Sequence, residues 1–128
     1  MKIIRFTVAA AAACAALMLP VAGSSAEGTD AAERANPKII RVADDFFSPD
    51  STRVARRRVI SWVWSNRNEN AHNVRLRRAP GGVDKGRFRS PSRRTNFRFS
   101  RRVRKPGRYV FVCSFHAPEM RLVVRVRR

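Results

Sequence analysis

Several residue types are scarce in this chain of 128 residues, and each scarcity excludes a class of protein. Only 9 residues are acidic, against 28 that are basic, so the formal net charge is +19. Two cysteines are too few for a disulfide-rich scaffold. No apolar run approaches the ~20 residues that span a bilayer, so we do not expect an integral membrane protein. Eight Phe and two Trp supply enough apolar surface for the core of one domain, which excludes a disordered chain.

The N-terminal segment has the layout of a secretory signal peptide. Lys2 and Arg5 precede an apolar run at 6–19, and Ser24-Ser25-Ala26 offers small residues for cleavage. A buried N-terminal helix is the alternative, but nothing later in the chain has the helical periodicity to pack against it. We therefore predict a signal peptide at 1–26 and export to the periplasm, the cell surface or the medium.

The chain that remains after cleavage holds few residues that can bind a metal. Residues 27–37 are polar and Ala-rich without an apolar face, so we expect a flexible leader, and the folded domain should cover 38–128. A lone thiol in an exported protein cannot form an internal disulfide, so it must pair with another chain, stay reactive or bind a metal. The Cys, His and Met residues in this part of the chain are His72, Cys113, His116 and Met120.

Short segments with a period of two follow one another from residue 38 onward. In the last of them, Leu122 and Val124 share a face opposite Arg121 and Arg125, which is typical of a strand with one face in water. The segment 109–113 is apolar on both faces and should lie inside a sheet. Many short strands predict an all-β sandwich or barrel. Strands are expected at 39–42, 52–54, 59–64, 74–76, 96–99, 109–113 and 120–126, with a weaker candidate at 87–89.

Three of the potential ligands lie within eight residues. Cys113 ends a buried strand and Met120 begins the next, so a tight turn containing His116 can aim all three side chains at one point. His72 also lies at a strand end and can join them if the loops share one end of the sandwich. Two His and one Cys with a weak axial Met define a blue copper site. Thiolate and thioether suit Cu(I), while imidazole suits both oxidation states.

Other interpretations of these residues compete with copper. A buried Cys is often an inert core residue, and a His is often a structural hydrogen-bonding group. A Cys/His₂ set can bind zinc, although a thioether is a poor zinc ligand. A Cys–His nucleophile pair is a third option, but a catalytic Cys is usually activated at an exposed, electropositive position. The joint occurrence of all four potential ligands favours copper.

From residue 38 to 128 the chain resembles the cupredoxins of the plastocyanin and amicyanin group. The resemblance is carried by Ala71-His72-Asn73-Val74, by the strand at 106–113 and by Cys113-Ser114-Phe115-His116. It implies an eight-stranded Greek-key sandwich and one type 1 copper ion that alternates between Cu(I) and Cu(II). The protein would transfer single electrons and would not be an enzyme. The family's ligands map onto His72, Cys113, His116 and Met120, its bracing Asn onto Asn73, and its electron port onto the exposed edge of His116.

Two features depart from the family pattern. Relatives often have two or four residues between the second His and the Met, whereas three separate His116 from Met120, which affects the axial bond and the reduction potential. The turn before the Trp-containing strand is often Gly-Asp in relatives and is Arg57-Arg58 here.

The basic charge is the remaining feature of the sequence. Much of it lies on the outward slots of strands, but clusters at 56–58, 93–94 and 101–105 lie in loops. These clusters could attract acidic redox proteins, or an anionic membrane or cell-wall surface. We do not expect nucleic acid as a partner, because the chain is exported and has no aromatic-interleaved reading surface. We expect a monomer. A copper storage or delivery protein with the same ligands, and a basic polyanion-binding sandwich, are the alternative functions.

Overall fold

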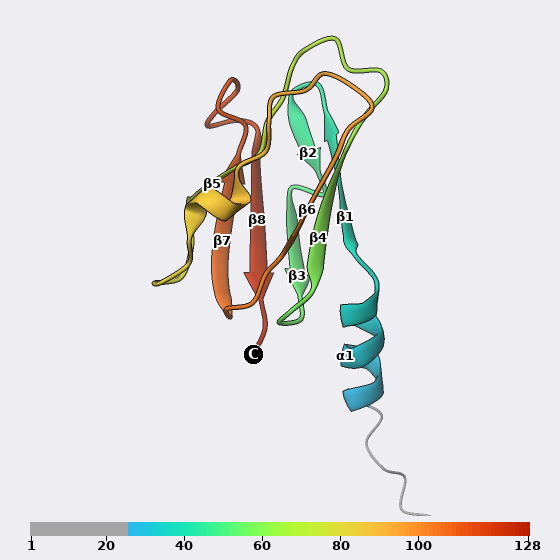
Figure 1. Cartoon of the computed structure of the whole chain (residues 1–128), viewed down its shortest axis with the longest axis vertical. Helices are drawn as coiled ribbons and strands as arrows, with labels where there is room; N and C mark the ends of the chain where they lie inside the picture. The colour runs from blue at the N-terminus through green and yellow to red at the C-terminus, as the bar shows by residue number, and fades with distance from the viewer. Residues whose placement is uncertain (1–25) are drawn as a thin grey trace, which may run out of the picture.

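The alternating segments form eight strands in the computed structural model, which describes residues 26–128. The strands make two four-stranded sheets, in the orders β2-β1-β4-β6 and β3-β8-β7-β5 (Figure 1). The predicted all-β sandwich of about eight strands is confirmed. The strands are β1 (Lys38–Ala43), β2 (Phe46–Ser48), β3 (Ser51–Val54), β4 (Val59–Trp64), β5 (Arg75–Arg78), β6 (Arg98–Arg102), β7 (Gly107–Val112) and β8 (Arg121–Val126).

The core lies between the two sheets. In β8, Leu122 and Val124 are buried while Arg121 and Arg125 are exposed, as the alternation predicted. The last four residues of β7 are all buried, and this strand lies between β8 and β5. Trp62 packs across the core against Phe111 with ring centroids 4.9 Å apart. Burial of such large aromatic side chains is the main source of stability for the sandwich.

The strand directions gather the loops at two opposite ends. β1 runs parallel to β4, and β3 runs parallel to β8. We call one end the cysteine end; its loops are 44–45, 65–74, 90–97 and 113–120. We call the other the arginine end; its turns are 55–58 and 103–106, and the last two residues of β6, Arg101 and Arg102, lie beside them. The six residues of β7 separate the two ends by about 20 Å, at ~3.3 Å per residue.

Residues 26–35 form a helix that the sequence did not predict. The helix α1 (Ala26–Ala35) is rich in Ala, the residue with the highest helix propensity. Its Glu33 accepts a hydrogen bond from the backbone N–H of Ala55 at 3.3 Å and pairs with Arg58 at 2.7 Å. It also pairs with Arg127. The expectation that the chain holds no helix is therefore wrong for this segment, whereas the flexible leader at 27–37 stays a prediction. The segment lacks an apolar face, and Glu33 makes the contacts that such a face usually makes.

The eighth strand is β2, and the weaker candidate at 87–89 is not a strand, although Arg89 forms an isolated bridge with Arg75. That region holds the short 3₁₀ helix η1 (Lys85–Phe88) instead. The side chain of Asp84 caps it by accepting from the backbone N–H of Gly86 at 2.8 Å. Phe88 is buried, which explains its apolar appearance in the sequence.

The predicted signal peptide lies outside the described residues except for Ala26, and its cleavage and the domain boundaries stay predictions. Among residues 26–128, no helix is both long enough and apolar enough to cross a membrane.

Candidate metal centre

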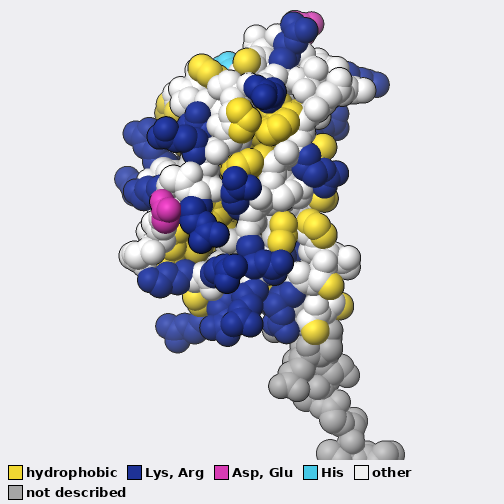
Figure 2. Space-filling view, viewed as in Figure 1, with side chains coloured by type: hydrophobic (Ala, Val, Ile, Leu, Met, Phe, Trp, Pro, Cys, Tyr) yellow, Lys and Arg dark blue, Asp and Glu magenta, His cyan; other side chains and the backbone are white. Residues whose placement is uncertain are grey.

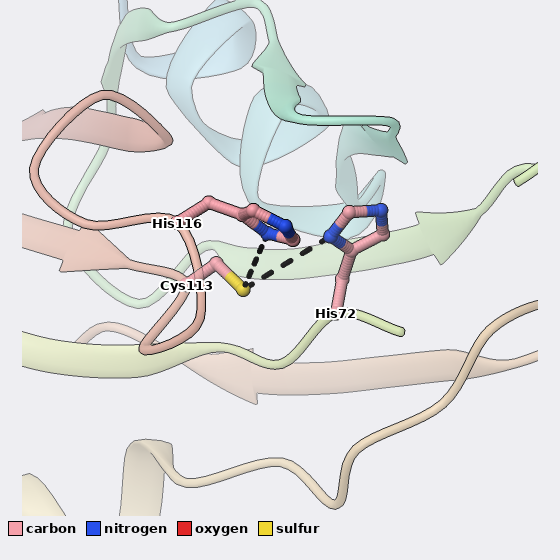
Figure 3. A group of neighbouring side chains, drawn as sticks. All are labelled: His72, Cys113 and His116. Atoms are coloured by element: carbon pink, nitrogen blue, oxygen red, sulfur yellow. Dashed lines mark hydrogen bonds between the residues drawn. The ribbon is translucent and has the colours of Figure 1, made fainter. Parts of the chain in front are cut away.

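His72, Cys113 and His116 come together at the cysteine end (Figure 3). Cys113 directly follows β7, His116 lies in the loop between β7 and β8, and His72 lies shortly before β5. One side-chain donor atom from each of the three lies within 4.8 Å of the others. His72 and Cys113 are fully buried, while the His116 side chain is 27% exposed. One of the three residues therefore reaches the surface.

The loop at 113–120 is closed by its own backbone. The N–H of Cys113 donates to the carbonyl of Met120 at 3.1 Å, and the N–H of Met120 donates to the carbonyl of His116 at 3.0 Å. The N–H of His116 donates to the carbonyl of Cys113 at 3.3 Å. Met120 is fully buried and lies close to the other three potential ligands. The structure thus forms the tight turn that the sequence predicted.

Asn73 joins this loop to the segment that carries His72. Its side-chain amide donates to the hydroxyl of Ser114 at 2.7 Å, and its carbonyl oxygen accepts from the N–H of Ser114 at 2.9 Å. Asn73 is 1% exposed, so water does not compete for these bonds. Because Asn73 follows His72 and Ser114 follows Cys113, the two hydrogen bonds fix the relative positions of these two potential ligands.

His72 is oriented by a carboxylate that the sequence analysis did not identify. Its Nε2 lies 2.7 Å from Oδ1 of Asp44. The backbone N–H of Glu69 and then the His72 ring hold the pKa of Asp44 below its ordinary value. An ionised carboxylate only accepts, so Nε2 donates its proton to Asp44 and Nδ1 is the ring nitrogen left to face a metal ion. That Nδ1 points toward Cys113 (Figure 3).

His116 has a similar partner. Its Nε2 lies 3.2 Å from Oδ1 of Asp45, whose side chain is 53% exposed. Its Nδ1 also faces Cys113. The sequence signal for both carboxylates was weak, because Asp44 lies 28 residues from His72. Two adjacent acids in so basic a chain were the only hint.

The distances between donor atoms fit a single metal ion. Sγ of Cys113 lies 3.6 Å from Nδ1 of His116 and 4.0 Å from Nδ1 of His72. A metal ion that binds sulfur at ~2.3 Å and nitrogen at ~2.0 Å, the bond lengths of zinc, would hold the sulfur and nitrogen atoms about 3.7 Å apart in a trigonal plane. The donor set itself, with a thiol, two imidazoles and a nearby thioether, is the one that suits copper.

The alternative of a nucleophilic cysteine is disfavoured by burial. Cys113 is 0% exposed, and it follows a strand. A reactive thiol needs access to a substrate and is commonly activated at a helix N-terminus. The arrangement is therefore better suited to holding an ion than to attacking a substrate.

Comparisons with known proteins connect this geometry to a fold. No protein-family model and no curated protein sequence matches the chain. The structure is similar to a proline-to-glycine mutant of amicyanin in its reduced Cu(I) form, with a TM-score of 0.60 and 22% identity over 76% of this chain and 89% of that one. It is similar to a purple cupredoxin from Nitrosopumilus maritimus, with a TM-score of 0.58 and 24% identity over 70% of this chain and 99% of that one.

A larger copper protein contains a similar region. The copper-containing nitrite reductase from Thermus scotoductus SA-01 has a TM-score of 0.62 and 21% identity over 73% of this chain. This chain spans only 23% of the length of that reductase. At identities this low, the structural similarity establishes only that the chain shares its fold with these proteins.

Proposed function

From its cupredoxin fold, we propose that this chain is an exported type 1 copper protein that carries single electrons between redox partners. The observation that supports the proposal most directly is the position of the three donor atoms. Both Nδ1 atoms face Sγ of Cys113 at the spacing of a trigonal metal site. The signal-like N-terminus supports export, because Lys2, Arg5 and the apolar run after them follow the usual layout.

The four potential ligands have two roles. Cys113, His72 and His116 would hold the ion, and Met120 would be a fourth, weaker ligand. Bound copper would supply a reversible change between Cu(II) and Cu(I). The hydrogen bonds between Asn73 and Ser114 hold the segments that carry His72 and Cys113 in fixed positions. A site that moves little between the two states exchanges electrons quickly.

The surface around His116 is suited to a brief contact with another protein. Phe115 is 57% exposed and Phe46 is 51% exposed. Phe115 adjoins His116, and Phe46 follows the Asp45 that contacts it. Exposed aromatic side chains are the usual anchors of protein interfaces. We expect electrons to enter and leave through the exposed edge of His116, with the redox partner on this face.

The arginine cluster at 101–105 lies at the opposite end from this face. About 20 Å of β7 separates the cluster from Cys113, which exceeds the screening length of ~8 Å at physiological salt. We still propose an acidic redox partner, because the net positive charge of the chain favours its encounter with an acidic protein at low salt. Neutralising four residues of this cluster should then lower the rate of electron exchange with an acidic partner no more than neutralising four other basic residues. The cluster residues are Arg101, Arg102, Arg104 and Lys105, and the residues for comparison are Arg75, Arg77, Arg125 and Arg127.

The colour of the copper-loaded protein tests the proposal. Added Cu(II) should give an intense blue or green band from charge transfer between thiolate and copper, and ascorbate should bleach it reversibly. Cys113→Ser should abolish the band, because a hydroxyl is a hard and poorly ionised ligand. A colourless copper adduct of the unaltered protein would contradict a type 1 site. Slow reduction combined with ready loss of copper to a chelator would favour storage or delivery.

A further inference from the structure

The arginine end presents positive charge that electron transfer at the opposite end does not use. The charge comes from the β3–β4 turn, the last residues of β6 and the β6–β7 turn. Figure 2 shows Lys and Arg side chains crowded toward this end, while acidic side chains are few on the face in view. The basic residues of these segments are Arg56, Arg57, Arg101, Arg102, Arg104 and Lys105, all exposed, and the half-buried Arg58, whose charge is already paired with Glu33.

Several of these charges are held in place by hydrogen bonds. Arg102 donates to the carbonyl of Arg57 at 2.6 Å, which ties the end of β6 to the β3–β4 turn. Arg101 donates to the carbonyl of Arg87 at 2.6 Å, and its guanidinium lies 4.3 Å from the centroid of the Phe99 ring. Side chains that are already ordered lose less conformational entropy when they bind a charged surface.

The backbone at Arg57 also favours a smaller residue than the one present. Its φ is 72°, in the left-handed region that disfavours side chains other than Gly. Arginine therefore adds charge to this turn at a conformational cost.

The chemistry of this end indicates a charged surface as its partner rather than a protein. Among the described residues, the exposed large apolar side chains are Ile39, Phe46 and Phe115, and none lies in 55–58 or 101–106. A stable protein interface usually has an apolar core within a polar rim, and this end offers no such core. Positive charges that come from several segments at one end of a sandwich are instead complementary to a flat anionic layer. Each Lys or Arg near such a layer contributes ~1 kcal/mol.

We propose that the arginine end binds the surface of a membrane that contains anionic phospholipids. The strands would then stand away from the membrane and place the cysteine end about 20 Å or more above it, facing water. The protein would be confined to the membrane surface with its electron port accessible to other proteins. Membrane binding does not depend on copper, because no proposed ligand lies at the arginine end.

Co-sedimentation with lipid vesicles tests this proposal. Copper-free protein should bind vesicles that contain phosphatidylglycerol and should not bind vesicles of phosphatidylcholine alone. The triple variant Arg56→Gln, Arg57→Gly and Arg104→Gln should bind about 100-fold more weakly, at ~1 kcal/mol for each charge and 1.4 kcal/mol for each tenfold. The control triple variant Arg67→Gln, Arg94→Gln and Arg121→Gln removes the same charge elsewhere and should change binding only a few-fold.

Three results would overturn the proposal. Equal losses in the two triple variants would show that net charge acts without a specific surface. Tighter binding to soluble teichoic acid than to vesicles, at equal phosphate, would replace the membrane by a wall polymer. Slower reduction by ascorbate of copper-loaded protein on vesicles than in solution would show that the cysteine end faces the membrane.

The β1–β2 turn places one carboxylate on each of the two imidazoles. Asp44 lies 2.7 Å from Nε2 of His72, and Asp45 lies 3.2 Å from Nε2 of His116. In both rings the contact is on the nitrogen remote from Cys113. A hydrogen bond to the remote nitrogen fixes the tautomer and orientation of a metal-binding imidazole.

Resting on the proposed copper function, we infer that Asp44 and Asp45 are positioning residues that also set the reduction potential. Two negative charges next to the ligands stabilise Cu(II) relative to Cu(I) and lower the potential. Asp44 should have the larger effect, because its side chain is 29% exposed and that of Asp45 is 53% exposed. Charges nearer to water are screened more strongly.

Substitution with Asn separates charge from orientation, because Asn keeps an acceptor oxygen. Asp44→Asn and Asp45→Asn should raise the potential and keep the colour, with the larger shift for Asp44→Asn. Asp44→Ala should also shift the visible band. Glu69→Gln removes a charge at the same end without an imidazole contact and should change the potential less. A coloured protein whose potential is the same in all variants would overturn this inference, whereas a colourless unaltered protein would overturn the copper proposal itself.

Discussion

The two ends of the sandwich are built on different principles. At the cysteine end, buried side chains are joined by directed hydrogen bonds, such as those between Asn73 and Ser114 and between His72 and Asp44. At the arginine end, exposed charges gather over turns, one of which holds Arg57 in the left-handed region. The first end depends on exact positions, and the second on the amount of charge. The difference predicts that substitutions at the cysteine end have large local effects and that those at the arginine end have small ones.

Asn73→Ala should have the largest effect. It removes two hydrogen bonds to Ser114 and leaves the N–H of Ser114 without its partner. We expect a loss of about 2–3 kcal/mol in the free energy of unfolding of the copper-free protein, measured with urea. Ser92→Ala removes only a 3.5 Å contact with the same Asn73 and serves as the control. A loss below that of the control would mean that Asn73 does not brace the loop.

Met120→Leu should have a smaller effect on stability but a clear one on copper. Leu has a volume similar to that of Met, and it would occupy the same fully buried position. The free energy of unfolding should therefore fall by less than about 1.5 kcal/mol. Without the thioether, copper should stay bound and its reduction potential should rise. Voltammetry measures this rise. An unchanged potential would show that Met120 is only a core residue.

Glu33→Gln should weaken the attachment of α1 near the arginine end by up to about 1 kcal/mol, because its ion pairs are partly exposed. Burial raises the pKa of Glu33, but Arg58 and Arg127 outweigh it and hold the pKa below its ordinary value. The stabilisation is therefore present above the pKa of the unfolded chain and is lost as the pH falls through the pKa of the folded protein.

Thermal unfolding between neutral and acidic pH measures the contribution of Glu33. The unaltered protein should lose more stability toward acid than Glu33→Gln does. Glu119→Gln, at the exposed cysteine-end loop, is the control. Parallel curves for the unaltered protein and Glu33→Gln would show that the helix is not held by charge.

Arg57→Gly should have the smallest effect, and it should be stabilising. Relief of the left-handed backbone is worth about 1–2 kcal/mol, and the extra freedom of Gly in the unfolded chain costs about 0.5–1 kcal/mol. The net gain should be about 0.5 kcal/mol in urea unfolding. Arg56→Gly at the neighbouring position should not be stabilising. Destabilisation by Arg57→Gly would mean that its side chain contributes to the fold.

The sequence was informative where a local pattern reported burial. The alternation in β8 and the apolar β7 predicted strands that the structure confirms, and the short spacing from Cys113 to Met120 predicted their approach. α1 was missed because it is tied down by one polar residue, Glu33. Asp44 was missed because its contact with His72 depends on how β1 and β4 pair, which no local pattern reveals.

The pairing of β3 with β8 has a consequence for folding. β2 and β3 are consecutive in sequence but belong to different sheets, and Ser51 pairs with Val123 near the far end of the chain. Neither sheet can close before most of the chain is in place, and such non-local pairing makes folding slow. His72 and Cys113 come from distant parts of that chain. The blue band should therefore appear late in refolding, so the ligand set acts as a chromophoric reporter of the last step of assembly.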